Sequence, residues 1–316
     1  MKKLATLTPA DKLTKKRRFD VENFQLWTLA IIPVILVFIF NYIPMSGLVM
    51  AFKHYNYRDG MFMSPWVGFE NFKLLLTSDI FVRITRNTLG MNFLMIIAQT
   101  VAAVLLALLL FRLKSRNATK VYQTILITPN FLSWVVVSYM AYTLLHPTSG
   151  SLNSLLTLFG MEKVDWYSTP GPWPVILTVA AVWKHVGMDS LIYYATLMGI
   201  DTSMVEAAQV DGANKRQIDR YIMLPGLAGI MCIQIILKIG NIFRADFGLF
   251  YQVPRNVTVL YSTTDVIDTY IFRAMRIDGD MGISTATGML QSVVGFAMVM
   301  LTNYIVNKVD SDKALF

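Results

Sequence analysis

The sequence predicts an all-α membrane protein with six transmembrane helices and with both termini in the cytoplasm. Of its 316 residues, 55% are hydrophobic and only 15% are charged, and the mean hydropathy is +0.50. Soluble domains carry roughly 25% charged residues, so this composition indicates a chain that lies largely within a bilayer. Long charge-free runs and an uneven distribution of Lys and Arg indicate the same class.

Six apolar stretches are long enough to cross a bilayer, which takes about 20 helical residues. They are 23–52, 87–111, 121–161, 173–200, 226–243 and 281–307. The third includes an outer loop that is expected to begin near His146-Pro147. The fourth and fifth contain charged side chains, and we expect each to cross whole, because splitting the fourth at its charges would leave pieces too short to span.

Lysine and arginine residues are unevenly distributed between alternate polar segments. With the N-terminus inside, the inner segments hold 16 of them and the outer segments hold 10. Because cytoplasmic segments carry the excess of positive charge, both termini and the segment 201–225 are predicted to be cytoplasmic. The predicted organisation is a basic N-terminal segment over 1–26, a six-span domain over 27–307 and a tail over 308–316.

The N-terminal segment is predicted to stay attached to the first span. A signal peptide has an apolar core of roughly 7–15 residues and a small-residue cleavage site. The first apolar run of this chain is longer and lacks such a site near its end. The stretch from about Asp11 to Gln25 is expected to lie along the inner membrane surface, with its basic side chains near anionic lipid headgroups.

Several activities are disfavoured by what the sequence lacks. Cys232 is the only cysteine, so neither a disulfide framework nor a cysteine-based metal site can form. The histidines His54, His146 and His185 lie far apart, and no catalytic or metal-binding cluster is evident. A Gly-rich phosphate loop is absent, so this chain is expected to bind no cofactor. The net charge is +8, and the basic residues cluster between the spans. They do not form the folded polar surface that nucleic-acid binding would need.

The polar segment between the fourth and fifth spans is the most informative part of the chain. Ser203 and Glu206 have the spacing of a capping box at a helix start. Ala207-Ala208 offers a small-residue face that another surface can approach closely. Asp211-Gly212 suits a helix stop, and Pro225 is expected to mark the start of the next span.

This segment resembles the EAA loop of the permease subunits of binding-protein-dependent, type I ABC importers. The chain reads Glu-Ala-Ala, three residues, Gly, nine residues, Ile, one residue and Leu-Pro, as the family pattern does. The candidate coupling-loop residues are Ser203, Glu206, Ala207, Ala208, Asp211, Gly212, Ile222, Leu224 and Pro225.

The resemblance implies the six-span type I ABC importer permease fold and a transport subunit that is not itself an enzyme. In that family the loop forms a coupling helix that docks on a separate ATPase, which uses ATP and Mg. The expected partners are a second permease subunit in a heterodimer, two ATP-binding cassette subunits and an extracytoplasmic solute-binding protein. In the family that binding protein meets outer regions, here 53–86 and 246–280. The expected location is the bacterial cytoplasmic membrane.

Further stretches look like the branch of the family that imports oligosaccharides, which includes maltose-type permeases. The resemblance therefore implies an oligosaccharide substrate, and a non-sugar solute is the alternative. The stretches are Thr128–Trp134, Gly150–Asn153, Trp183-Lys184, Gly187, Ile200-Asp201, Asp211–Ala213 and Asp268–Tyr270.

Charged side chains inside two spans are candidates for the substrate path. Lys184 and Lys238 fall near mid-depth, where a charge must face the bundle interior or a wet cavity. Either lysine can instead pair with Asp189 and pin two helices together, and the two roles are compatible. If the lysines line the path, an acidic oligosaccharide is favoured. Flat apolar faces and polar partners for a sugar are offered nearby by Trp183, Tyr193, Tyr194, Asn241 and Phe243.

Two other classes of function are compatible with a multi-span chain. A secondary transporter driven by an ion gradient would show two related halves with broken helices, and no internal similarity is evident. A membrane enzyme acting on lipid-linked sugar would need paired carboxylates near one interface. Asp265 and Asp268 are the nearest candidates, and both are expected on an outer loop. Uptake that requires internal ATP and an external binding protein distinguishes an importer from both classes.

Overall fold

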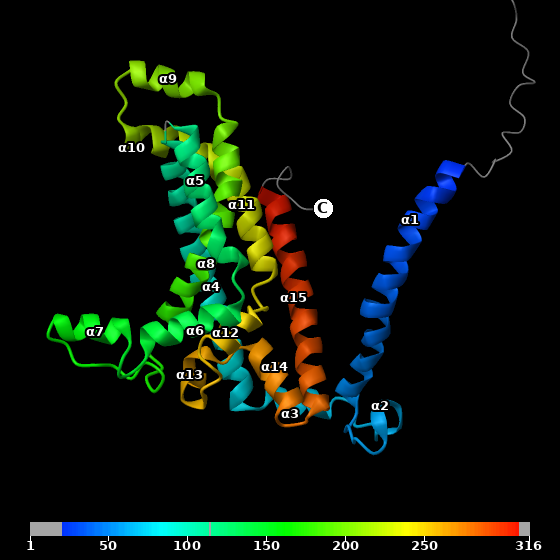
Figure 1. The fold of residues 1–316 in the computed structure, drawn as a ribbon. Coiled ribbons are helices and arrows are strands. Elements are labelled where there is room, and N and C mark those ends of the chain that lie inside the picture. The colour runs from blue at the N-terminus through cyan, green and yellow to red at the C-terminus, as the bar shows by residue number, and fades with distance from the viewer. Residues whose placement is uncertain (1–20, 114, 310–316) are drawn as a thin grey trace, which may run out of the picture. The chain divides into compact units, whose positions relative to one another are not determined.

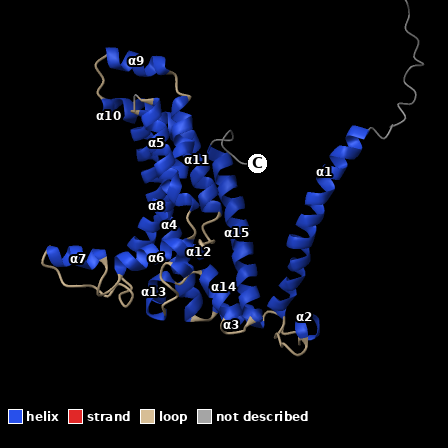
Figure 2. Ribbon diagram, in the orientation of Figure 1, coloured by secondary structure: helices blue, strands red, loops and turns tan. Residues whose placement is uncertain are grey.

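The computed structural model describes residues 21–113 and 115–309, and its elements there are helices, as the all-α prediction requires (Figure 1, Figure 2). Lys53 and Trp66 add one isolated antiparallel bridge. The first 20 residues of the predicted basic segment, most of the predicted interfacial helix and residues 310–316 lie outside the described part. The chain divides into two units, Met1–Val49 and Met50–Phe316, which are described in turn.

In the first unit, the first apolar stretch is helical, and its side chains are exposed over residues 27–46. α1 (Val21–Val37) continues into the π-helical turn η2 (Phe38–Tyr42), and the 3-10 helix η3 (Ile43–Phe52) follows. The stretch Trp27–Phe52 has 26 residues and a mean hydropathy of 2.2. It is therefore long and apolar enough for the predicted first span.

The second unit is built around long helices that lie side by side (Figure 1). They are α4 (Asp79–Phe111), α8 (Trp173–Met198), α11 (Leu224–Gly240) and α15 (Met281–Val309). α8 packs most extensively against α4, and α11 packs against α15. Each belongs to a stretch long and apolar enough to cross a membrane, which agrees with the second, fourth, fifth and sixth predicted spans.

The third apolar run is a broken helix, which corrects the prediction of a plain span within 121–161. α5 (Arg116–Ile127) and the 3-10 turn η4 (Thr128–Phe131) are bent by 97° from α6 (Trp134–Leu145). In the described part of the chain, five helices can therefore cross a membrane, or six if this bent pair is one span. The loop that was predicted to begin near His146 does begin there, directly after the last residue of α6.

Local backbone chemistry explains the break. Pro129 has no N–H group to donate to the helix ladder. Leu132 and Ser133 are extended, and the Ser133 hydroxyl oxygen accepts the Val136 N–H at 3.3 Å, so a new helix starts there. The carbonyls of η4 and Leu132 then need other partners, which α8 supplies.

The helix that contains the predicted fifth span starts earlier than Pro225, the residue expected to mark the start of that span. α10 (Lys215–Ile218), the π-helical turn η5 (Asp219–Met223) and α11 form one stretch from Lys215 to Gly240. A proline inside a helix disrupts the backbone hydrogen bonds of the preceding turn. The wider turn η5 lies directly before Pro225, and Leu224 N–H donates to the Asp219 carbonyl there. The helix therefore continues through the proline.

Short helices gather at the two ends of the bundle (Figure 1). α9 (Thr202–Val210) lies at one end, beside α10. The shorter elements at the opposite end are α3 (Glu70–Leu76), α12 (Phe247–Gln252), η6 (Thr258–Leu260), α13 (Tyr261–Thr264) and α14 (Ile267–Arg276). The loops also carry α2 (Gly60–Met63) and α7 (Ser151–Leu158).

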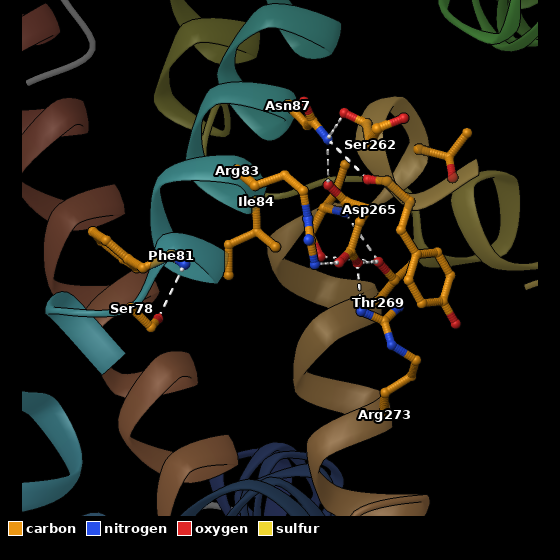
Figure 3. Close-up of polar contacts among 12 residues, drawn as sticks. Ser78, Phe81, Arg83, Ile84, Asn87, Ser262, Asp265, Thr269 and Arg273 are labelled. Atoms are coloured by element: carbon orange, nitrogen blue, oxygen red, sulfur yellow. Dashed lines mark hydrogen bonds and ion pairs between the residues drawn. The ribbon is translucent and has the colours of Figure 1, made fainter. Parts of the chain in front are cut away.

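A buried carboxylate joins α14 and its preceding loop to the start of α4 (Figure 3). The Asp265 side chain is fully buried and forms ion pairs with Arg83 at 3.0 Å and Arg273 at 2.7 Å. Thr269 Oγ1 donates to the same carboxylate at 3.0 Å, and Asn87 Nδ2 donates to the Asp265 carbonyl at 3.0 Å. With its charge committed to two arginines, Asp265 is a structural anion rather than a partner of Asp268 in a catalytic pair.

Replacing Asp265 by asparagine should destabilise the purified protein by about 3 kcal/mol, because it leaves two arginines facing a buried neutral group. The measurement is the thermal unfolding midpoint in detergent. Asp278→Asn, at an exposed carboxylate near the end of α14, is the matched control and should leave the midpoint unchanged. Equal midpoints for the two variants would contradict a stabilising role for this network.

Candidate functional site

The predicted coupling loop contains the exposed helix α9, which begins with a different cap from the predicted one. Asp201 caps it, and Asp201 Oδ1 accepts the Ser203 N–H at 2.9 Å. This hydrogen bond lowers the pKa of the Asp201 carboxyl below its ordinary value. The predicted capping box of Ser203 and Glu206 is wrong, because the helix already begins at Thr202.

The helix stop predicted at Asp211-Gly212 is confirmed, because α9 ends at Val210. Gly212 has a φ of +81°, which favours glycine. The Gly212 N–H donates to the Gln209 carbonyl at 3.1 Å, and the Ala213 N–H donates to the Ala208 carbonyl at 2.9 Å. Together these bonds form a Schellman motif, which satisfies carbonyls that the helix leaves free.

One face of α9 rests on the bundle and the other is free. Val205 and Ala208 pack against a core cluster that α4 and α8 share with Ile218, Met223 and Leu227. Glu206 and Ala207 are exposed, and Val210 is 88% exposed. An apolar side chain with that exposure, on a helix held by defined caps, marks a surface that is available to a partner.

The remaining coupling-loop residues lie on the helix that follows. Ile222 packs against the same core cluster as α9, and Leu224 and Pro225 are exposed on the first turn of α11. A capping box does occur in this loop, at Asn214 and Gln217, where Gln217 Oε1 accepts the Asn214 N–H at 2.7 Å. The sequence pattern Asn-x-x-Gln is a signature of that cap.

Lys184 supports the broken helix and lines neither of the two cavities described below. Its buried ammonium donates to the carbonyls of Asn130 at 2.9 Å and Pro129 at 3.4 Å, and also to that of Leu132. It lies 5.2 Å from the centroid of the Trp134 ring. The ammonium therefore satisfies the carbonyls of Asn130 and Leu132 at the bend, and it adds to the Leu132 N–H that the Pro129 carbonyl already accepts.

Lys238 and Asp189 form the ion pair that the sequence left open as an alternative. Lys238 Nζ lies 2.8 Å from Asp189 Oδ2 and 3.3 Å from Gln99 Oε1. These contacts join α11, α8 and α4. The pair is structural, and Lys238 also lies at the wall of a cavity.

That cavity has a volume of about 350 Å³ and is lined by α4, α6, α8, α11, α12 and the loop after α11. Of the predicted substrate-path residues, only Lys238 and Asn241 line it. Tyr193 is buried in the core beside α9, and Trp183 does not line the cavity. The full lining is Asn92, Met95, Ile96, Gln99, Trp134, Ala181, His185, Leu237, Lys238, Asn241, Arg244, Asp246 and Leu249.

Most polar and aromatic groups in this cavity belong to side chains that were not among the predicted substrate-path residues. Trp134 Nε1 donates to Asp246 Oδ2 at 2.7 Å, and the other oxygen of Asp246 accepts the Leu249 N–H at 3.3 Å. His185 Nδ1 lies 3.0 Å from Asn130 Oδ1. An aromatic face, a carboxylate, an imidazole and a guanidinium, that of Arg244, thus share one space.

Two side chains hold the loop that forms one wall of the cavity. Asn92 Nδ2 on α4 donates to the carbonyl of Ile242 at 2.7 Å and to that of Arg244 at 3.0 Å. Asp268 accepts the Ala245 N–H at 2.8 Å. Burial raises the pKa of the Asp268 carboxyl above its ordinary value, against the effect of that hydrogen bond.

A smaller cavity of about 260 Å³ adjoins this loop on the side of α15. Phe243 lines it, so this predicted path residue lies beside the larger cavity rather than in it. Asn241 and Arg244 line both spaces. Among the described residues, no cluster of three His, Cys, Asp or Glu side chains could hold a metal ion.

Comparison with a family model decides the class of the protein. Residues 91–310 match the model of the binding-protein-dependent transport system inner membrane component. The chain belongs to this family. The match covers the bent third span, the cavity and the whole of segment 201–225, so the resemblance seen in the coupling loop is confirmed at the level of the family.

Two relatives of this inner membrane component carry sugar-transport names. The polygalacturonan/rhamnogalacturonan transport system permease protein YteP of Bacillus subtilis is 31% identical over 300 residues, which cover 94% of this chain and 93% of YteP. The trehalose/maltose transport system permease protein MalF of Thermococcus litoralis is 28% identical over 301 residues, which cover 92% of this chain and 97% of MalF.

Solved structures confirm the type I ABC permease fold of this family member. A chain of a bacterial ABC transporter involved in the import of the acidic polysaccharide alginate has a TM-score of 0.82 and 31% identity. The match covers 92% of this chain and 97% of that one. A bacterial alginate ABC transporter in complex with an alginate pentasaccharide-bound periplasmic protein gives a TM-score of 0.81 and 31% identity, with 91% and 96% covered.

Proposed function

We propose that this permease moves an oligosaccharide across the bacterial cytoplasmic membrane and is driven by ATP hydrolysis in separate subunits. The observation that carries the proposal is α9, a capped helix that rests on the bundle by one face and leaves Glu206, Ala207 and Val210 exposed. Family membership supports a transport role for the whole chain.

The proposed assembly has four further components. A second permease subunit completes the translocation path, two ATP-binding cassette subunits bind ATP and Mg, and an extracytoplasmic binding protein delivers the solute. The segment 201–225 is proposed to fit a groove in one ATPase. The periplasmic protein present in the alginate transporter complex supports the binding-protein component.

An oligosaccharide is the proposed substrate because the cavity offers the groups that a sugar uses. The Trp134 ring can pack against a pyranose face, and Asp246, Asn241 and Gln99 can bind hydroxyl groups. The relatives include permeases named for acidic polysaccharides and one named for neutral trehalose and maltose. Both substrate types are carbohydrates, which makes a non-sugar solute the weaker alternative.

Alternating access is the proposed mechanism. Closure of the ATPases on ATP would push α9, and the packing of Val205 and Ala208 would pass that movement to the core cluster that joins α4, α8 and α11. These helices also carry walls of the cavity, so its opening would turn from the inner to the outer side and receive the sugar. ATP hydrolysis would then reset the assembly.

Reconstitution of the complete complex in proteoliposomes tests the proposed function. Uptake of a labelled oligosaccharide should require both ATP on the ATPase side and the binding protein on the other side. An imposed proton or sodium gradient without ATP should drive no uptake. Gradient-driven uptake without ATP would instead indicate the secondary transporter.

A further inference from the structure

Arg244 differs from the other charged residues that line the larger cavity. Lys238 is neutralised by Asp189 at 2.8 Å, and the Asp246 carboxylate accepts hydrogen bonds from Trp134 and from the Leu249 N–H. Within the described ranges 21–113 and 115–309, the Arg244 guanidinium makes no hydrogen bond and no ion pair, and its side chain is exposed. The partly buried Asp268 carboxylate attracts Arg244 but forms no ion pair with it, so Arg244 is the cation of this cavity that is available to bind an anion.

The backbone that carries Arg244 is nevertheless held in place. Its N–H donates to the Asn241 carbonyl at 2.9 Å, and its own carbonyl accepts from Asn92 Nδ2 at 3.0 Å. The next N–H, that of Ala245, donates to Asp268 at 2.8 Å. Because this backbone is already ordered, ligand binding needs to restrict only the Arg244 side chain, and less conformational entropy is lost.

The neighbouring groups indicate which anion fits. The Trp134 ring and the Asp246 carboxylate line the same cavity, so a sugar ring can pack on the indole while its hydroxyls donate to the carboxylate. A guanidinium presents parallel N–H donors that match the two oxygens of a carboxylate. A uronic acid combines a pyranose ring, hydroxyl groups and one carboxylate, and so matches all three side chains.

We infer that Arg244 is a specificity-determining residue that binds the carboxylate of a uronic-acid oligosaccharide in the larger cavity. This inference rests on the proposed function, since it concerns the substrate of the same transport path. It also replaces the sequence-based hypothesis that Lys184 or Lys238 attracts an acidic sugar, because both ammonium groups are committed within the protein.

The test compares two sugars of equal length in the reconstituted complex, a galacturonate oligosaccharide and its carboxyl-reduced, neutral counterpart. For Arg244→Gln, ATP-dependent uptake of the acidic sugar should fall roughly tenfold or more relative to the wild type, the effect of losing a charge-assisted hydrogen bond. Uptake of the neutral sugar should stay within about twofold, because its recognition involves no carboxylate. Arg244→Lys should restore part of the acidic uptake.

Arg276→Gln is the matched control, since Arg276 is exposed on α14 and lines neither cavity. It removes one outer positive charge and should affect both sugars equally and slightly. Suppose that the wild type shows ATP-dependent uptake. If Arg244→Gln then lowers the uptake of both sugars equally, or lowers the uptake of neither, the assignment of Arg244 is overturned. Wild-type uptake that needs no ATP would instead overturn the proposed function.

Discussion

Replacing Gly187 by alanine should destabilise the protein by about 3 kcal/mol, the upper part of the usual range for overpacking. A methyl group at this position would overlap the backbone carbonyl of Leu126. Both residues lie inside helices, α8 and α5, so neither backbone can move without displacing its whole helix. Because total stability is often only about 5–15 kcal/mol, the variant should show a large drop in its unfolding midpoint and in membrane expression.

Gly90→Ala in α4 is the matched control, because a methyl group there meets no other atom within 4 Å. An alanine inside a helix is favoured over glycine by about 0.5–1 kcal/mol, so this variant should be as stable as the wild type or slightly more stable. A Gly187→Ala variant as stable as the wild type would contradict the close approach of α8 to α5.

Replacing Glu206 by lysine should lower ATP-dependent uptake about tenfold or more while leaving the stability of the permease unchanged. Glu206 is exposed, so the fold does not depend on its carboxylate. At a docked surface, loss of one partner of a buried charge pair costs about 2–5 kcal/mol. Transport and ATP hydrolysis should be measured together on the same preparation, since failed coupling lowers uptake per ATP consumed.

Glu162→Lys provides the charge-matched comparison, at an exposed carboxylate in the loop after α7. This loop lies at the other end of the molecule from α9 (Figure 1). Uptake should stay near the wild-type level. Comparable losses in both variants would mean that the effect arises from net charge rather than from the surface of α9.

The long helices could be predicted from the hydropathy of long stretches of sequence, whereas the breaks within helices could not. Length and hydropathy suffice for the spans that contain α4, α8 and α15. The 97° bend depends on Lys184 and Gly187, which lie on one face of α8 and meet a segment more than 50 residues away in the sequence. Pro129 was the local signal of that break, but helices that contain proline can also continue, as α11 does through Pro225.

The helix stop after α9 was predictable because its signal is local, whereas the cap at the start of α9 was not predicted correctly. The left-handed conformation of Gly212 and its Schellman bonds follow from neighbouring residues. The cavity was less predictable, because Trp134, His185 and Asp246 come from separate elements. Lys238 was singled out by its charge within an apolar span, and the structure commits that charge to Asp189. Arg244 carried no such signal, since it follows the end of α11 and looks like an ordinary loop residue.

Site-specific photo-crosslinking from Val210, the 88% exposed residue at the end of α9, tests the central claim most directly. The matched position is Phe159, which is 79% exposed after α7. In the assembled transporter, a crosslinker at Val210 should capture an ATP-binding cassette subunit, and one at Phe159 should not. Capture of the extracytoplasmic binding protein from Val210, or no difference between the two positions, would contradict the account.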